Sequence, residues 1–396
     1  MMTIFQDYLR THPWLTFRLD LQEADHNFWM LLAEAYAKSQ FIVDMPLLPD
    51  VAEWLHGLTL VRGVLATTAI EGNTLTEQEV ADRLEGKLEL PPSREYLGKE
   101  VDNIAEACNL INSRLHEGAS RDLSPKDIRE LNRIVLKDLP LNDDVLPGEL
   151  RKHRAVVGRY LAAPPEDLDY LLNRLCNFLN KFLDESGRYR AAYCILKSIV
   201  AHLYLAWIHP FGDGNGRTAR LVEFQILSSS GYPTTAAHLL SNHYNKTRTE
   251  YYRQLDRASK SSGNIIPFLE YAIEGFRDGL DEQLEVIRDQ QLEVHWINYV
   301  YNQFSSRHKE RDRRIRRLVL DLTDRKAPIE RGKVRGISPR VSEYYLGKSE
   351  RTIQRDLSEL KEMGLILESD GEIRVNLRLM FSLFPKSLPN IEDRSR

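Results

Sequence analysis

Twelve residues near the middle of the chain, from His209 to Arg220, constrain its fold more than any other segment. They read His-Pro-Phe-Gly-Asp-Gly-Asn-Gly-Arg-Thr-Ala-Arg and combine an imidazole, a carboxylate, an amide and two guanidiniums with three glycines. Gly212, Gly214 and Gly216 alternate with polar residues, so no amphipathic period explains them. The glycines indicate a backbone that bends around a ligand. The charged groups indicate an anion, a metal ion and a nearby proton transfer.

The elements on either side predict how this segment could hold a phosphate chain. An apolar helix would deliver His209 at its C-terminal end, and the next helix would point its free N–H groups and positive dipole end at the loop. Arg217 and Arg220 are three residues apart and share a helix face. Asp213 is a hard oxygen ligand suited to Mg²⁺, and His209 could accept a proton from a hydroxyl near neutral pH. The constellation indicates nucleotidyl or phosphoryl transfer.

Two other interpretations of the segment are weaker. Gly214 to Ala219 matches the dinucleotide pattern GxGxxA, but that pattern requires a preceding strand, and the residues before it are predicted to be helical. A glycine-rich helix cap with surface charges would not need so many chemically distinct groups.

The segment resembles the signature of the Fic family (filamentation induced by cAMP), HxFx[DE]GNGRxxR, at every fixed position. The resemblance extends over roughly residues 20 to 260. Residues 148–165 resemble the flap of that family and read as extended, with Gly158 where a hairpin would turn. Residues 251–255 resemble its tyrosine-rich helix. The resemblance implies a mainly α-helical core with a β-hairpin flap, and transfer of AMP from ATP to a Ser, Thr or Tyr hydroxyl of a target protein or of the chain itself.

The resemblance also implies roles for individual residues. His209 would be the general base, Asp213 would hold Mg²⁺, and Phe211 would anchor the loop in the core. The positions that would bind ATP are Gly212, Gly214, Asn215, Gly216, Arg217 and Arg220 along the phosphates and Tyr252 at the adenine. The flap residues that would bind target backbone as an added strand are Val156, Val157 and Gly158.

A related group, the doc toxins, phosphorylates its targets instead. Its loop replaces the second and third glycines with bulkier residues and lacks the last arginine. Because Gly214, Gly216 and Arg220 are all present here, the resemblance favours AMP transfer over kinase chemistry.

Thr67 to Gly72 fits the inhibitory motif of the same family, [ST]xxxE[GN]. Glu71 would pair with Arg220 in a charge-assisted bond, bidentate at best, and so keep this arginine from the γ-phosphate. A solvent-facing glutamate at a helix end is the alternative for an isolated motif of this length. In some relatives the same glutamate positions a water that removes AMP, so a Glu71-dependent de-AMPylase is an alternative function.

The last part of the chain predicts a second kind of module. Residues 315–322, 338–346 and 349–363 have helical patterns, and a predicted hairpin turns at Asp370-Gly371, which is the order of a winged helix. The residues that would reach base edges are Arg351, Thr352, Gln354 and Arg355. Residues 307–317 form a basic cluster expected to contact phosphates. The module could instead serve protein contact or a homodimer. A DNA-binding regulator whose Fic part senses nucleotide is therefore a further alternative.

Composition and charge agree with this division. The formal net charge is −4, but residues 301–396 hold 22 Lys and Arg against 15 Asp and Glu, a balance of +7 that leaves −11 elsewhere. We predict three domains: 1–95 with the inhibitory helix, 96–300 with the Fic core and a linking helix, and 301–396. Three scattered cysteines fit a reducing compartment. No signal peptide and no run of about eighteen apolar residues is evident, so we expect a cytoplasmic protein with no membrane segment.

Overall fold

Helices form most of this computed structural model, which describes residues 7–118, 122–158, 160–181, 189–261, 263–323 and 327–381. The chain divides into two compact units, residues 1–284 and 285–396. The helices of the first unit and the one that leads into the second are α1 (Tyr8–Thr11), α2 (His26–Asp44), α3 (Pro49–Ala69), α4 (Glu77–Leu84), α5 (Glu95–His116), α6 (Pro125–Val135), α7 (Leu168–Asn180), α8 (Arg190–Ile208), α9 (Asn215–Ser229), α10 (Thr234–Ala237), α11 (Leu239–Lys246), α12 (Arg248–Lys260) and α13 (Ile266–Gln303). The predicted mainly helical class is confirmed.

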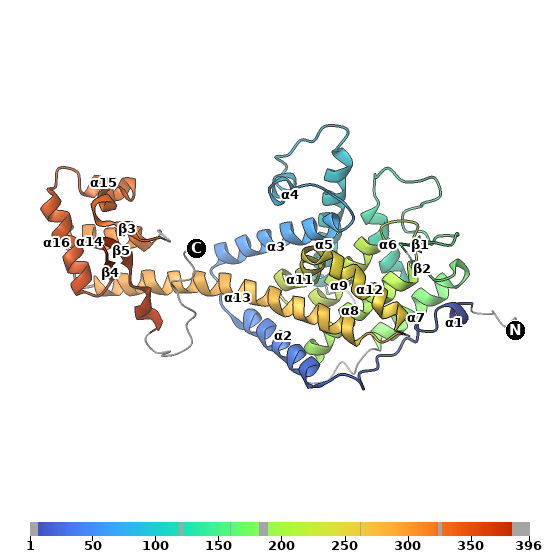
Figure 1. The fold of residues 1–396 in the computed structure, drawn as a ribbon. Helices are drawn as coiled ribbons and strands as arrows, with labels where there is room; N and C mark the ends of the chain where they lie inside the picture. The colour runs from blue at the N-terminus through green and yellow to red at the C-terminus, as the bar shows by residue number, and fades with distance from the viewer. Residues whose placement is uncertain are drawn as a thin grey trace. The chain divides into compact units, whose positions relative to one another are not determined.

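Two helices in the middle of the first unit, α8 and α9, carry the glycine-rich segment between them (Figure 1). Most side chains of α8 are buried, which explains its apolar composition. α8 is also long and apolar enough to cross a membrane, although 78% of its apolar window is buried inside the fold, as in a core helix of a soluble protein. The expectation that no segment reaches this length and hydropathy was therefore wrong.

Local sequence signals fix several helix starts near the site. Ser124 caps α6 by accepting from the backbone N–H of Asp127, and Pro125 takes the first helical position, as expected. Thr76 and Glu79 form a capping box that starts α4, a helix that the sequence analysis did not predict. The three cysteines are free and buried, as we expect for thiols that are not part of a disulfide frame.

The extended segment after α6 forms a short antiparallel hairpin of β1 (Val156–Val157) and β2 (Tyr160–Leu161). Val156 pairs with Leu161 and Val157 with Tyr160. Gly158 occupies the turn with φ 60°, a left-handed conformation that glycine adopts without strain. The predicted hairpin and its turn residue are confirmed.

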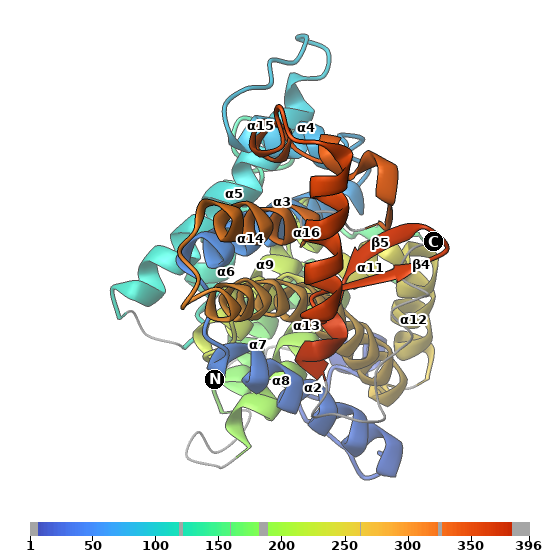
Figure 2. The same cartoon turned by 90° about the vertical axis from the view of Figure 1, so that its left-hand side faces the viewer.

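The second unit combines helices with a three-stranded sheet. Its elements are α14 (Glu310–Thr323), β3 (Ile329–Glu330), α15 (Pro339–Tyr344), α16 (Glu350–Glu362), β4 (Ile366–Ser369) and β5 (Glu372–Val375), and the strand order is β3-β5-β4. The hairpin of β4 and β5 lies beside α16 (Figure 2). It turns at Asp370 and Gly371, both with positive φ, as the sequence predicts.

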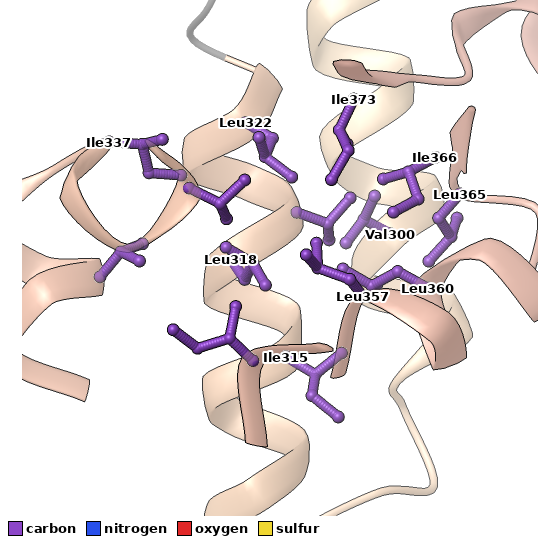
Figure 3. Packing of buried hydrophobic residues seen from close by; sticks show 14 of the residues in the cluster. Val300, Ile315, Leu318, Leu322, Ile337, Leu357, Leu360, Leu365, Ile366 and Ile373 are labelled. Carbon is purple, nitrogen blue, oxygen red and sulfur yellow. The ribbon is translucent and has the colours of Figure 1, made fainter. Parts of the chain in front are cut away.

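An apolar cluster forms the core of this unit. Side chains from α14, α16 and the hairpin point toward one another (Figure 3), among them Leu318, Leu322, Leu357, Leu360, Ile366 and Ile373. Trp296 and Val300 of α13 belong to the same cluster. The last turns of α13 therefore pack with the second unit, and the predicted division of the chain into three domains stays a prediction.

Candidate functional site

His209 lies immediately after α8 in a left-handed conformation, with φ 49° and ψ 61°. A residue other than glycine in this region carries strain on the order of 1 to 3 kcal/mol, so its surroundings must hold it there. Its backbone N–H still donates to the Leu205 carbonyl at 2.9 Å. The α8 helix thus ends by turning sharply at the residue that we predict to be the base.

Arg151, a buried residue at the start of the flap segment, holds the His209 backbone in this position. Its Nε donates to the His209 carbonyl at 2.7 Å, and its backbone N–H donates to the Pro210 carbonyl at 3.0 Å. Its Nη1 donates to the His153 carbonyl at 2.6 Å, and Nη2 donates to the Ala163 carbonyl. One guanidinium therefore connects both ends of the flap segment to the candidate base. This role of Arg151 has no signal in the sequence, because nothing local shows that the residue is buried.

The loop after His209 is closed from inside by Asn215. The backbone N–H of Phe211 donates to Asn215 Oδ1, and Asn215 Nδ2 donates to the Phe211 carbonyl, both at 2.9 Å. Phe211 is buried, as predicted. The Asn215 side chain is thus occupied in holding the loop, and its backbone N–H, in the first turn of α9, is the group that could donate to a ligand.

Asn132 on α6 ties the same loop to the start of the flap. Its Nδ2 donates to the Asp213 carbonyl at 2.9 Å, and its Oδ1 accepts from the Gly148 backbone N–H at 2.9 Å. Gly214 precedes α9 with φ 73°, and a Cβ there would lie 3.0 Å from Asn132 Nδ2. The positive φ favours glycine, and a larger side chain would be tightly packed against α6. Asn132 carries no sequence signal and was not predicted.

The first turn of α9 retains unsatisfied donors. No side chain caps this end of the helix, so its N–H groups stay available to a ligand. Arg217 and Arg220 are buried, yet Arg217 Nε and both Nε and Nη1 of Arg220 have no hydrogen-bond partner among the described residues. Because buried donors rarely lack partners, these groups together indicate an anionic ligand.

Two carboxylates contact these arginines. Arg220 Nη2 donates to Glu71 Oε1 at 2.6 Å and to the Thr67 carbonyl at 3.0 Å. Arg217 Nη1 donates to Glu100 Oε1 at 2.7 Å. The predicted contact between Glu71 and Arg220 is present, through one nitrogen rather than in the bidentate form. Glu100 lies outside both sequence motifs and was not predicted.

The Glu71 carboxylate occupies space that Gly216 leaves open. A Cβ on Gly216 would lie 2.3 Å from Glu71 Oε1. Burial would raise the pKa of Glu71, but the charges of Arg220, Arg217 and Arg248 and the hydrogen bond from Arg220 outweigh it, so its pKa is lower than usual. Glu71 is therefore ionised at neutral pH and occupies one donor of Arg220.

The candidate base is held uncharged. Burial and the nearby charge of Arg151 lower the pKa of His209 to about 4, although Glu71 and Asp213 oppose the shift. A neutral imidazole can accept a proton, which is the state that a general base requires.

Asp213 lies at the solvent side of the loop, with about half of its side chain exposed. Its Oδ1 accepts from the Gly214 backbone N–H and lies 3.5 Å from Arg217 Nη2. The described residues contain no group of three or more His, Cys, Asp or Glu that could hold a metal ion. A single exposed carboxylate beside a phosphate site fits Mg²⁺, which takes most of its ligands from phosphate oxygens and water.

The tyrosine-rich helix α12 places Tyr252 and Tyr251 differently. Tyr252 is exposed, with its ring centroid 5.1 Å from that of Tyr251 and its hydroxyl 3.5 Å from the Ile70 carbonyl. Tyr251 is buried, and its hydroxyl lies 2.8 Å from His202 Nε2. His202 Nδ1 in turn lies 2.9 Å from Glu223 Oε2. Tyr252 is thus next to the Glu71 segment, whereas Tyr251 belongs to a buried polar network behind it.

The flap exposes apolar side chains and one free strand edge. Val156 and Val157 are exposed. His12 Nε2 lies 2.8 Å from the Leu161 carbonyl, which occupies part of the outer edge of β2. The outer edge of β1, which carries Val156, has no strand partner among the described residues. An added strand would therefore pair along β1.

The candidate DNA contacts in the second unit divide into two groups. Arg351 and Arg355 are exposed, one turn apart on α16, and have no ion-pair partner among the residues that the structure describes. Thr352 Oγ1 lies 3.2 Å from Ser349 Oγ. Gln354 accepts from Arg331 and donates to Glu350 at 3.2 Å, so its amide is already engaged.

The basic cluster at residues 307–317 does not present a row of free arginines. Arg314 Nε donates to the buried Asp356 at 2.8 Å, and Arg307 Nη1 donates to Glu359 at 2.8 Å. Arg311 pairs with Glu359, and Arg317 pairs with Asp321. Carboxylates of α14 and α16 therefore pair with these four arginines within the unit, and the expectation that the cluster contacts phosphates stays a prediction.

Comparison with known proteins agrees with the geometry of the first unit. Residues 122–227 match the Fic/DOC family. The chain is 34% identical over 208 residues to "Protein adenylyltransferase fic-1" of Caenorhabditis briggsae, which covers 52% of this chain and 38% of that protein. It is 31% identical over 229 residues to "Protein adenylyltransferase Fic" of Drosophila melanogaster, which covers 56% and 42%. The chain thus spans about two fifths of the length of these curated relatives.

Solved structures show the same fold. Fic-1 (residues 134–508) from Caenorhabditis elegans superposes with a TM-score of 0.55 at 25% identity, covering 66% of this chain and 73% of that one. A Fic family protein from Desulfovibrio desulfuricans G20 superposes with a TM-score of 0.53 at 19% identity, covering 88% of this chain and 95% of that one. At 19% identity, the comparison with the Desulfovibrio desulfuricans protein is evidence of a shared fold alone.

Proposed function

We propose that this chain is a protein adenylyltransferase, which transfers AMP from ATP to a hydroxyl of a target protein or of itself, because residues 122–227 match the Fic/DOC family. The observation that carries the proposal is the pair of buried arginines at the start of α9. Arg217 and Arg220 both keep guanidinium donors without partners among the described residues, and they flank a helix N-terminus that can bind phosphate. The relatives named as adenylyltransferases support the same activity.

The residues of the loop can perform the transfer as follows. The neutral imidazole of His209 accepts the proton of a Ser, Thr or Tyr hydroxyl as its oxygen attacks the α-phosphorus. A new bond forms between that oxygen and the α-phosphorus. The bond between the α-phosphorus and the oxygen that it shares with the β-phosphate breaks, which releases pyrophosphate. The first-turn N–H groups of α9 and the two arginines stabilise negative charge on the phosphates. Asp213 would hold Mg²⁺, which would neutralise part of that charge.

The target protein would bind along the flap. The free edge of β1 offers the backbone groups of Val156 to an added strand, and the exposed valines offer apolar contacts. Arg151 links this segment to the His209 carbonyl. A hydroxyl on the added strand would therefore be held at a fixed distance from the base.

The position of Glu71 supports the proposal that this enzyme is autoinhibited before it is activated. It holds Arg220 Nη2, one of the donors that the γ-phosphate would need. A Glu71-dependent removal of AMP is the alternative, since the carboxylate is ionised and lies in the same space. Loss of AMP from a modified target that requires Glu71 would distinguish this activity.

The group transferred is tested by intact-mass measurement. The Glu71→Gly variant incubated with ATP and Mg²⁺ should gain the mass of one or more AMP groups, because removal of Glu71 frees Arg220 to bind the γ-phosphate in the adenylyl-transfer pose. A gain equal to phosphate would instead support the kinase chemistry of the doc toxins and would refute the proposal. His209→Ala serves as the control that should show no gain.

A second candidate function concerns the second unit, for which exposed Arg351 and Arg355 provide the observation. We propose that α16 of a winged helix contacts duplex DNA, rather than a protein partner, through these two arginines. The 396-residue chain should bind duplex DNA more tightly at about 50 mM than at about 200 mM salt. Replacing Arg351 and Arg355 together with alanine should weaken binding about tenfold or more.

A matched control for the DNA experiment removes two exposed arginines from the first unit, Arg10 and Arg253, with the same change in net charge. This variant should bind DNA as the parent does. Equal loss in both double variants would indicate nonspecific attraction, and absence of binding at low salt would exclude the DNA function.

A further inference from the structure

One carboxylate on α5, that of Glu100, contacts both the candidate nucleotide loop and the inhibitory segment. Its Oε1 accepts from Arg217 Nη1 at 2.7 Å, and its Oε2 accepts from Asn73 Nδ2 at 2.9 Å. Asn73 follows Glu71 by two residues, and the same Nδ2 also donates to the Leu97 carbonyl of α5 at 2.9 Å. The Arg217 and Glu100 side chains are both largely buried. The contact is therefore part of the interior and not a loose surface pair.

The two nitrogens that a guanidinium uses for two-oxygen binding along its side are Nε and Nη2, which lie on the same edge. Glu100 engages Arg217 through Nη1, which is not on that edge. Arg217 Nε has no partner among the described residues, and Nη2 has only Asp213 Oδ1 at 3.5 Å. Glu100 thus leaves the two-donor edge of Arg217 available.

The contact between Glu71 and Arg220 has the opposite consequence. Glu71 and the Thr67 carbonyl both take Nη2 of Arg220, which belongs to the two-donor edge. A phosphate that binds along this edge must displace Glu71, whereas a phosphate on Arg217 need not displace Glu100. The two carboxylates therefore act differently on two arginines of the same helix turn.

We propose that Glu100 is a positioning residue, which orients Arg217 so that its Nε–Nη2 edge receives a phosphate oxygen pair of the nucleotide. Holding a long side chain in its binding geometry beforehand reduces the entropy lost when the ligand binds. The second oxygen of Glu100 accepts a hydrogen bond from Asn73, so the same carboxylate also contacts the segment that carries Glu71. The inference rests on the proposed function, because it takes the ligand at Arg217 to be a nucleotide phosphate.

Calorimetric titration with MgATP tests the proposal in the Glu71→Gly background, in which Arg220 is free. Glu100→Gln keeps the side-chain size but removes the charge that holds the guanidinium, and it should raise the Kd about tenfold. Glu106→Gln is the matched control, since Glu106 lies on the same helix and pairs with Lys137 at the surface at 2.7 Å. This control should leave the Kd within about twofold of the parent.

A conservative variant separates orientation from simple structural support. Glu100→Asp retains a carboxylate but is too short to keep both contacts at their present distances, so its Kd should lie between those of the parent and Glu100→Gln. In AMP transfer the same order should appear in KM for ATP, with a smaller change in kcat. A lowered Tm with an unchanged Kd in both variants would overturn the proposal.

The binding measurement also separates this inference from the proposed function. If the Glu71→Gly protein binds MgATP with the expected dependence on Glu100 but transfers no AMP, the function fails and the positioning role stands. If AMP is transferred and Glu100→Gln binds MgATP as the parent does, the positioning role fails and the function stands.

Discussion

Replacing Glu71 with glycine should raise auto-AMPylation by about tenfold or more, because it removes the charge-assisted hydrogen bond that holds Arg220. The carboxylate lies 2.6 Å from Arg220 Nη2 and fills the space beside Gly216. Without it, the γ-phosphate can take both donors on that edge of the guanidinium. Incorporation of label from α-labelled ATP, measured with Mg²⁺ at saturating nucleotide, gives the size of the effect.

A surface pair supplies the control for the Glu71 experiment. Glu77 pairs with Arg62 at 3.0 Å, and about half of each side chain is exposed. Glu77→Gly makes the same chemical change away from the loop and should leave incorporation unchanged. If Glu71→Gly also left incorporation unchanged while His209→Ala abolished it, Glu71 would not be an inhibitor of this chain.

Replacing His209 with alanine in the Glu71→Gly background should lower AMP transfer by about two to four orders of magnitude, the usual contribution of a general base. Binding of MgATP should change much less, because the phosphate contacts come from α9 and its arginines. His116→Ala, which alters an exposed histidine at the end of α5, is the control. Transfer that survived in the His209 variant would assign the base to another group.

The pH dependence follows from the low pKa of His209. Because burial and Arg151 lower this pKa to about 4, the imidazole is neutral at pH 5 and above. We expect kcat/KM to stay level from pH 8 to about 5 and to fall as the pH approaches 4. A base with an ordinary histidine pKa would instead lose activity near pH 6.5.

The same shift has a consequence for stability. The unfolded chain takes up a proton on this histidine near pH 6.5 and the folded chain only near 4, so acidification through this window lowers the free energy of unfolding. His209→Ala removes this contribution. The variant should lose less Tm than the parent between pH 7 and 5, as measured by thermal unfolding.

Much of the local structure could be predicted from the sequence because local signals determine it. Ser124 and Pro125 start α6, Gly158 turns the flap hairpin, and Asp370-Gly371 turns the hairpin of the second unit. α4 carries an equally clear capping box at Thr76 and was overlooked. Helix caps and tight turns depend on side chains within three or four residues, so they are visible in a sequence.

The partners of charged residues could not be predicted in the same way. The basic cluster at residues 307–317 suggests a phosphate-binding surface, yet Arg314 is buried against Asp356. The reason is that α14 and α16 pack together through the apolar cluster of the second unit, which brings their opposite charges into contact. Sequence gives the charge of such a residue, but packing decides whether solvent or a carboxylate neutralises it.

The sequence by itself determined which chemical groups this protein can bring to a reaction: an imidazole, a carboxylate, two arginines and three closely spaced glycines. The tertiary structure alone decided which nitrogen of each arginine is occupied and that Arg151, Asn132 and Glu100 hold the loop. These contacts join residues that lie far apart in the chain. No local pattern encodes them, because they arise only when α5, α6 and the flap pack against the loop between α8 and α9.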